Sequence, residues 1–306
     1  MIVRSTHNWF RMLFVWNGSV LQSIIPQLAL MALVSVLAVI TDGRILGEKV
    51  PLDTTPFTLC GVALTIFLAF RNNASYDRYW EARRMWGHVL IAGRTLTSQV
   101  LAYIPADTKD FDRSAFVRTV IAFAYALKHQ LRKTDPYEDL ALRVGAARAI
   151  VLKGKHYRPI AILNELRLAL GDLQRNGAVS DTRLWMFDAQ LNELEQMVGG
   201  CERIASTPIP FAYGVLLHRT VYAYCILLPF GLVDSLGIFT PFITVFVAYT
   251  LIALEAIASD ISEPFGTAPN NLALNAMTLT IERSLLELCE EAIPAEEAPV
   301  RRYQFT

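Results

Sequence analysis

The sequence predicts an all-α fold, in which a four-transmembrane-helix subunit carries a helical cytosolic domain. The chain of 306 residues is 53% hydrophobic and only 18% charged, with a mean hydropathy of +0.35. This composition is too apolar for an ordinary soluble domain and too charged for a protein confined to the bilayer. Its longest apolar stretches form four runs. Between the second and the third run, apolar residues repeat at helical spacing and signals for β-strands are nearly absent.

The first apolar run, Leu21–Ile40, is about long enough to cross a bilayer as a helix. It follows the stretch Trp9–Trp16, whose two tryptophans and one arginine are typical of an interfacial anchor. Because the run lacks a convincing small-residue cleavage site, we expect it to be retained. The second run, Pro56–Phe70, is short, and the helix that continues past Arg71 supplies the remaining length.

The middle of the chain, residues 71–210, is predicted to be a domain of about five helices without a candidate span. Proline, glycine and Asn-Gly breaks separate the helical patterns Ala74–Tyr103, Arg113–Leu131, Tyr137–Lys153, Pro159–Gln174 and Asp181–Ile204. Two further apolar runs follow, roughly Ile209–Val233 and Ser235–Ala258, and a last helix is expected over Leu272–Ala292.

These patterns divide the chain into five segments with a predicted membrane orientation. The segments are an N-terminal interfacial and cytosolic part (1–19), a first membrane helix pair (20–70), the helical cytosolic domain (71–210), a second membrane helix pair (211–258) and a cytosolic C-terminal helix and tail (259–306). Four spans place both termini on one side. Arginines cluster directly after the second span, so we expect the termini and residues 71–210 to be cytosolic.

One ridge of the second span is a candidate pore lining. Val62, Ile66 and Phe70 are spaced four residues apart, which places them along one face of a helix over about 12 Å. Several copies facing a shared axis would form narrow apolar rings, which can gate by dewetting. The same spacing also fits a lipid-facing or packing stripe, and the spacing alone does not decide between the two.

Polar residues near the inner ends of the spans are the next candidates. Arg71 and Asn73 are candidates for the inner rim of the neck, although Arg71 could equally be a snorkelling side chain. His218 and Arg219 are costly in an apolar run, and we expect a structural role at the inner interface, with Asp77 or Glu81 as partners. Glu255, near the inner end of the fourth span, is expected to pair with Arg219 or Arg71.

Other classes of function have little support in the sequence. The formal net charge is zero, which argues against a nucleic-acid partner. The four cysteines and five histidines show no metal-ligand spacing, and we expect no metal or other cofactor. There is no glycine-rich phosphate loop and no nucleophile elbow, so we expect no enzyme.

Three long stretches show a family resemblance. The segments FRNNASYDRYWEARRMWG (70–87), CERIASTPIPFAYGVLLHRT (201–220) and SDISEPFGTAPNN (259–271) resemble the bacterial branch of the bestrophins. The resemblance implies a homopentameric ion channel of the bacterial inner membrane, with one axial pore and a neck at Val62, Ile66 and Phe70. It also implies a cytosolic constriction near Val179, with Thr182 as the alternative.

Some properties of the family do not carry over. In animal bestrophins an acidic run after Pro-Phe-Gly helps to bind Ca²⁺, whereas here Thr267–Asn271 lacks charged ligands, so no Ca²⁺ site is expected.

The resemblance leaves open whether chloride and other small anions or monovalent cations such as sodium pass the pore. A secondary transporter and a non-conducting membrane scaffold or regulator are the alternatives to a channel.

Overall fold

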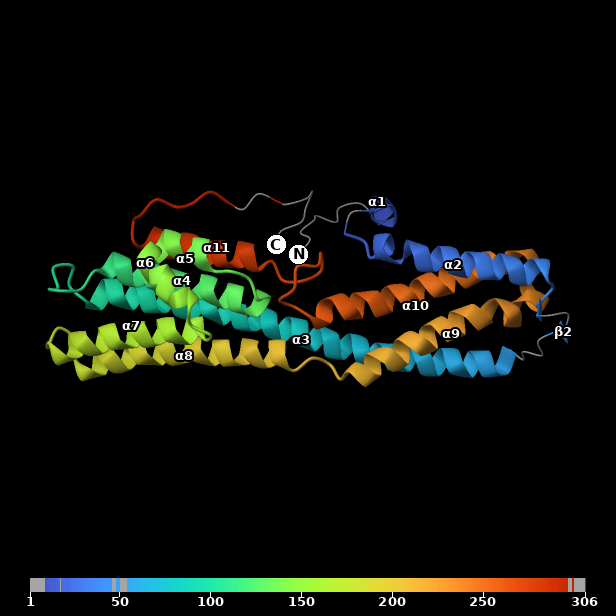
Figure 1. Ribbon diagram of the computed structural model, residues 1–306, viewed down its shortest axis with the longest axis horizontal. Helices are drawn as coiled ribbons and strands as arrows, with labels where there is room; N and C mark the ends of the chain where they lie inside the picture. Colours follow the sequence, from blue (N-terminus) through green and yellow to red (C-terminus); the bar gives the residue numbers. More distant parts are fainter. Residues whose placement is uncertain (1–8, 17, 46–47, 50–53, 297–298, 300–305) are drawn as a thin grey trace. The chain divides into compact units, whose positions relative to one another are not determined.

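A computed structural model describes residues 9–16, 18–45, 48–49, 54–296, 299 and 306 of the chain. It confirms the helical fold class. Long helices dominate, and β1 (Arg44–Ile45) pairs with β2 (Glu48–Lys49) in a two-residue antiparallel hairpin (Figure 1). The helices are α1 (Trp9–Leu13), α2 (Leu21–Ile40), α3 (Thr54–Tyr103), α4 (Arg113–Arg132), α5 (Tyr137–Val144), α6 (Ala146–Lys153), α7 (Arg158–Arg175), α8 (Asp181–Ser206), α9 (Phe211–Leu236), α10 (Thr240–Ser262) and α11 (Leu274–Leu288), with a 3-10 turn, η1 (Gly237–Phe239).

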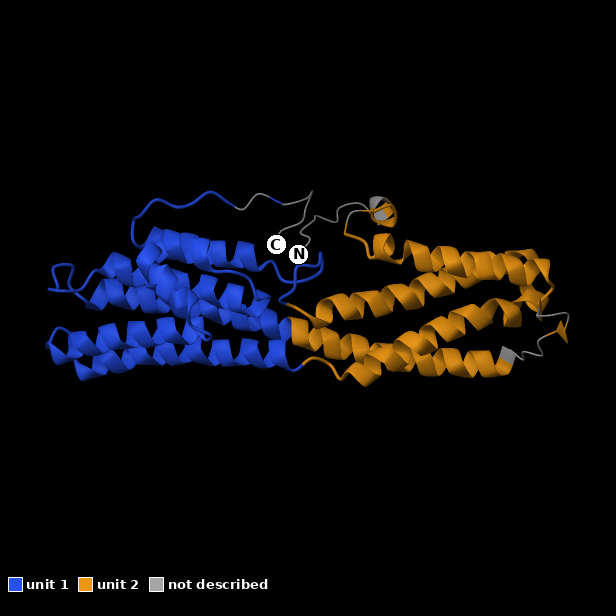
Figure 2. Ribbon diagram, in the orientation of Figure 1, with its two compact units in different colours: residues 1–3, 80–207, 265–306 blue, residues 4–79, 208–264 orange. Residues whose placement is uncertain are grey.

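The chain forms two compact units, drawn in different colours in Figure 2. One unit, called here the span unit, contains Arg4–Tyr79 together with Pro208–Pro264. The other, called the helical unit, contains Trp80–Thr207 and residues from Phe265 onward. The long helix α3 contributes residues to both.

The span unit holds the described stretches that are long and apolar enough to cross a membrane. By length and composition these are Leu21–Ile40, Thr55–Tyr103, which continues into the helical unit, and Phe211–Ser262. The last stretch contains two helices, because η1 separates α9 from α10 and Gly237 adopts a φ of +51° at the end of α9. The two later runs predicted from the sequence therefore correspond to α9 and α10.

The core of the span unit is built by four helices. Its buried residues are Ile24 and Met31 of α2, Leu64 and Leu68 of α3, Leu217, Val221 and Cys225 of α9, and Ala248, Leu251 and Ile252 of α10. Glycine permits the close approach of two of these helices. A Cβ on Gly231 of α9 would lie 2.9 Å from the ring of Phe57 in α3, so a side chain there would force the two helices apart.

In the helical unit, α4 is the central helix. Twelve of its residues are buried, from Phe116 to Lys128 with one exception, which is typical of a helix covered on nearly all sides. It packs against α5, α7, α8 and α11, and Asp112 caps its first turn by accepting a hydrogen bond from the backbone of Ala115.

The helix predicted over Tyr137–Lys153 is in fact two helices. Gly145 separates α5 from α6 and adopts a φ of +85°, a backbone conformation that favours glycine. The prediction of one continuous helix was wrong because it gave this glycine no weight as a helix terminator. The patterns for α4, α7 and α8 differ from the observed ends by at most two residues.

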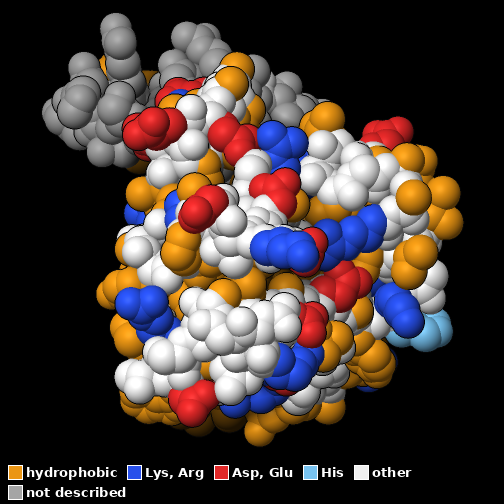
Figure 3. Space-filling model, turned by 90° about the vertical axis from the view of Figure 1, so that its left-hand side faces the viewer, with side chains coloured by type: hydrophobic (Ala, Val, Ile, Leu, Met, Phe, Trp, Pro, Cys, Tyr) orange, Lys and Arg blue, Asp and Glu red, His pale blue; other side chains and the backbone are white. Residues whose placement is uncertain are grey.

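The surface of the helical unit carries both signs of charge. Figure 3 views the end that lies on the left of Figure 1, and basic and acidic side chains alternate over it without a large region of one sign. This distribution agrees with the formal net charge of zero.

Candidate pore-lining site

The predicted ridge lies on an uncovered face of α3. Val62, Ile66 and Phe70 are 55%, 50% and 68% exposed within the subunit. On the opposite face of the same helix, Leu64 and Leu68 are 2% and 1% exposed and belong to the core. The helix thus separates a packing stripe from an equally apolar stripe that its own subunit leaves open.

An apolar groove of about 640 Å³ lies beside this ridge, between α3 and α9. Phe67 and Phe70 line it from α3, and Tyr213 and Leu216 line it from α9. Such a surface is unstable in water and needs a cover of lipid or protein. The groove therefore fits a helix pair that is embedded in a membrane or in an assembly.

Polar residues continue the uncovered face of α3 past its apolar part. Asn73 lies three residues after Phe70, and Asp77 lies seven residues after Phe70. Both side chains are exposed. At about 100° per residue these positions fall on the face of the ridge. Because α3 is expected to leave the bilayer near Arg71, this change of polarity fits a stripe that faces an aqueous passage and a lipid-facing stripe alike.

Glu255 of α10 connects α3 to α9. Its Oε1 lies 3.0 Å from Nη1 of Arg71, and the two side chains are 13% and 12% exposed. Nδ1 of His218 lies 3.8 Å from the same oxygen. Of the two partners expected for Glu255, the structure selects Arg71. This contact turns the guanidinium toward α10, and Arg71 therefore does not line the ridge.

The contacts expected for His218 and Arg219 differ from those observed. His218 approaches Glu255 rather than Asp77 or Glu81, and Arg219 is exposed. Glu81 instead pairs with Arg203 of α8 inside the helical unit. The expectation rested on sequence order along α3, which does not specify which side of the helix each carboxylate occupies.

The two candidates for the cytosolic constriction differ in burial. Val179 is 3% exposed, and its backbone N–H donates to the carbonyl of Leu173 at 3.2 Å, so its side chain packs within the subunit. A side chain in that position is poorly placed to line a shared passage. Thr182, in the first turn of α8, is exposed and stays the candidate. Ser180 caps α8, because its side chain accepts a hydrogen bond from the backbone N–H of Arg183.

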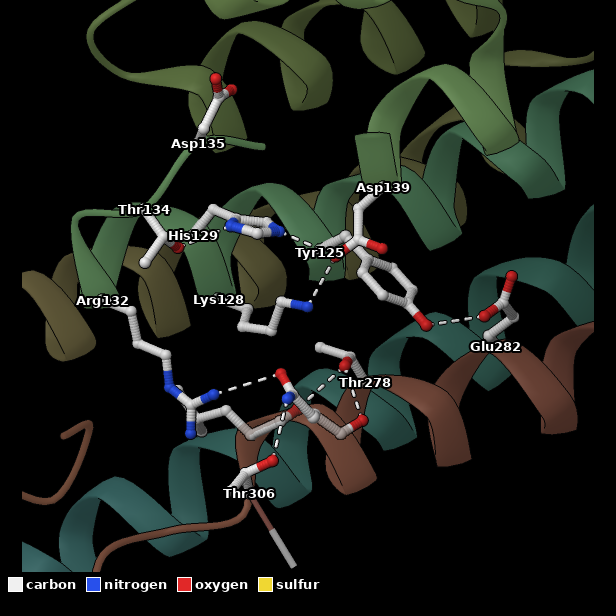
Figure 4. Close-up of polar contacts among 12 residues, drawn as sticks. Tyr125, Lys128, His129, Arg132, Thr134, Asp135, Asp139, Thr278, Glu282 and Thr306 are labelled. Carbon is white, nitrogen blue, oxygen red and sulfur yellow. Dashed lines mark hydrogen bonds and ion pairs between the residues drawn. The ribbon is translucent and has the colours of Figure 1, made fainter. Parts of the chain in front are cut away.

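A buried ionic network in the helical unit was not predicted from the sequence. Asp139 accepts a hydrogen bond from Lys128 at 2.7 Å and lies 2.8 Å from Nε2 of His129; Figure 4 draws both contacts as dashed lines. Tyr125 donates to Glu282 at 2.7 Å, and Arg143 donates to the same carboxylate at 2.7 Å. The network joins α4, α5 and α11, and its contacts with Glu282 link residues more than 130 positions apart in the sequence.

Burial and hydrogen bonding shift the acid–base properties of this network. Burial lowers the pKa of Lys128, against the effect of its ion pair with Asp139. Burial also opposes ionisation of Asp139, but hydrogen bonds with His129 and Lys128 hold the pKa of this carboxyl well below its ordinary value. Burial and the bond to Glu282 raise the pKa of Tyr125. Asp139 is therefore a carboxylate that the folded state keeps ionised.

Arg132 organises the loop between α10 and α11. Its guanidinium donates to the carbonyls of Phe265, Gly266 and Leu272 at 3.3 to 3.4 Å, and to the side-chain oxygen of Asn275 at 3.1 Å. Across the described part of the chain, no three His, Cys, Asp or Glu side chains form a group that could hold a metal ion. A fixed cation thus contacts the backbone oxygens of the loop in which animal bestrophins bind Ca²⁺.

Comparison with known proteins decides the family. The family described as bacterial and fungal bestrophin proteins matches residues 1–287. The chain belongs to the bestrophin family. Among curated bestrophin relatives, a protein of Ralstonia nicotianae is 47% identical over 304 residues and covers 99% of both chains. One of Escherichia coli K12 is 41% identical over 309 residues and covers 100% of both. Both are named voltage-dependent anion channel-forming proteins.

Solved structures give the same relationship for the bestrophin fold. A bacterial bestrophin homolog from Klebsiella pneumoniae superposes with a TM-score of 0.83 at 43% identity, over 88% of this chain and 99% of that chain. A variant of that homolog with a leucine-to-threonine substitution gives the same score and identity. The fold of this bestrophin is therefore shared over most of its length.

Proposed function

We propose that this bestrophin is the subunit of a homopentameric ion channel in the bacterial inner membrane, which conducts small monovalent ions passively. Membership of the family and the channel names of its relatives indicate an ion channel rather than an enzyme. Four membrane helices per subunit, with both termini and residues 71–210 in the cytosol, complete the proposed topology.

The observation that carries the proposal is the uncovered ridge of Val62, Ile66 and Phe70. Five copies around a shared axis would form three apolar rings, about 6 Å apart along the helix. Narrow apolar rings tend to exclude water, and a dewetted ring can act as a gate for ions. Asn73 forms the polar inner rim of this neck, and Thr182 lines the cytosolic constriction. The lipid bilayer and further copies of the same chain cover the remaining apolar surface.

Which ion passes is a separate question, because apolar rings do not distinguish charges by direct pairing. The names of the relatives favour anions such as chloride. In this chain, charged residues outside the neck decide whether the permeant ion is an anion or a cation. Conduction of sodium or other cations is the alternative to conduction of anions.

The test combines assembly and conduction of the purified protein. The protein mass of the purified complex, after the mass of bound detergent has been subtracted, should be about five times the 34.2 kDa of one chain. The same protein in liposomes should produce discrete unitary currents in asymmetric NaCl. Currents that require a fixed stoichiometry with a second solute would indicate a secondary transporter instead. A stable assembly without ion flux would indicate a scaffold or regulator, and either result would contradict the channel proposal.

A further inference from the structure

The face of α3 that carries the ridge also carries the acidic side chain of Asp77 at its inner end, whereas Glu81, farther along on the same side, is paired with Arg203. Taking about 100° per residue, Asp77 lies about 20° around the helix from Ile66. Arg71 and Arg78, the neighbouring basic residues, lie about 140° and 120° from Ile66. Among these three ionisable residues, only Asp77 shares the face of the ridge.

The contacts of the two arginines agree with this arrangement. Arg71 is paired with Glu255 of α10 at 3.0 Å and is 12% exposed. Nε of Arg78 donates to the backbone carbonyl of Ser262, also on α10, at 3.1 Å. Both positive groups are therefore held against the fourth helix of the span unit. Asp77 is exposed, and within the described residues its carboxylate forms no ion pair.

We propose that Asp77 is a specificity-determining residue, which biases permeation through the neck toward monovalent cations. This inference rests on the proposed function, because a pore is formed only if the ridge faces a shared axis. Five carboxylates around that axis would create a negative potential at the inner mouth of the neck, concentrating cations and depleting anions there.

On the same face of α3, the exposed Arg84 opposes this effect. It lies twice as far along the sequence from Phe70 as Asp77. Asp77 is about 10 Å from Phe70 along the helix. Potentials in physiological salt decay over about 8 Å, so the nearer charge dominates at the neck.

The magnitude is modest and depends on salt. Five unit charges about 10 Å away, in a high dielectric and with screening, change the ratio of cation to anion permeability by roughly three- to tenfold. The preference should weaken at high ionic strength, because the Debye length shortens.

The decisive experiment compares Asp77→Asn with wild type in liposomes under asymmetric NaCl, at low and at high ionic strength. Asp172→Asn is the matched control, because Asp172 is an exposed carboxylate on α7. We expect Asp77→Asn to conduct with a reversal potential shifted toward that of chloride, most strongly at low salt. Asp77→Glu should retain the wild-type value, and Asp172→Asn should leave it unchanged. Arg84→Gln should shift the potential in the opposite direction and by less.

Two results would overturn the inference, and they are distinguishable from failure of the channel proposal. The first is a conducting Asp77→Asn protein with the wild-type permeability ratio. The second is an equal shift in the Asp172→Asn control. If Asp77→Asn does not assemble, Asp77→Ser replaces it, and an unchanged ratio in that variant has the same meaning. An assembled wild type that does not conduct overturns the channel itself, and with it the role of Asp77.

Discussion

Glu255 and Arg71 form a nearly buried ion pair, with 3.0 Å between their charged atoms, that joins α10 to α3. Glu255→Gln should destabilise the span unit by about 3 kcal/mol, because it leaves the guanidinium buried without its counter-charge. Replacing both residues together, Arg71→Met with Glu255→Leu, should recover most of this loss.

Thermal unfolding in detergent measures this effect. The melting temperature of Glu255→Gln should fall by several degrees, whereas Asp234→Asn should change little. Asp234 is a suitable control because its pair with Lys49 is half-exposed, and exposed pairs contribute little to stability. Equal melting temperatures for wild type and Glu255→Gln would show that the pair does not stabilise the helix packing.

Asp139 makes the stability of the helical unit depend on pH. Its pKa in the folded state lies below the value of about 3.9 in the unfolded chain. Its contribution is therefore present above about pH 4 and is lost as the pH falls through the folded pKa. Asp139→Asn should lower stability at neutral pH by about 2–3 kcal/mol, because the buried Lys128 loses its negatively charged partner.

The measurement is the melting temperature of wild type and Asp139→Asn from neutral to acidic pH. The difference between the two proteins should be large at pH 7 and should shrink as the pH falls below about 4. Asp135→Asn, which removes an exposed pair with Lys153, is the control and should change little. A pH-independent difference would mean that Asp139 acts through packing rather than through its charge.

Calcium should not activate this channel through the loop after α10. Thr267–Asn271 offers no carboxylate, and Arg132 already donates to the carbonyls of Phe265, Gly266 and Leu272. A fixed positive charge at these oxygens repels a divalent cation. Currents recorded in liposomes should therefore be the same with and without micromolar Ca²⁺. A saturable rise of current with Ca²⁺ would contradict this prediction.

The sequence predicted most of the helices because hydrophobic periodicity and breakers act locally. The apolar runs correspond to α2, α9, α10 and the first part of α3, and the helical patterns correspond to α4, α7 and α8. Local signals failed at Gly145. This glycine separates two short helices, although the apolar pattern continues across it without a break. Helix ends depend on a few cap residues, such as Ser180 at the start of α8.

The candidate site was predicted in part. Spacing alone identified the ridge of Val62, Ile66 and Phe70, and the structure adds that its own subunit leaves it uncovered. Tertiary contacts lay beyond the sequence, because they join residues far apart in the chain. The network around Asp139 joins three helices, and the burial of Val179 depends on packing that no periodicity reveals. The contacts of Arg71 and Arg78 with α10 are of the same kind, because they join α3 to residues more than 180 positions away in the sequence.

Single-channel recording of Phe70→Ala beside Phe67→Ala tests the proposed neck most directly. Both residues are exposed phenylalanines of α3, at 68% and 54%, but Phe67 lies about 60° around the helix from Phe70, outside the ridge. Phe70→Ala should raise unitary conductance or open probability, as should Ile66→Ala, because each substitution widens an apolar ring. Phe67→Ala should behave like wild type. Unchanged conductance and open probability in Phe70→Ala and Ile66→Ala, or the same increase in Phe67→Ala, would contradict a neck formed by Val62, Ile66 and Phe70.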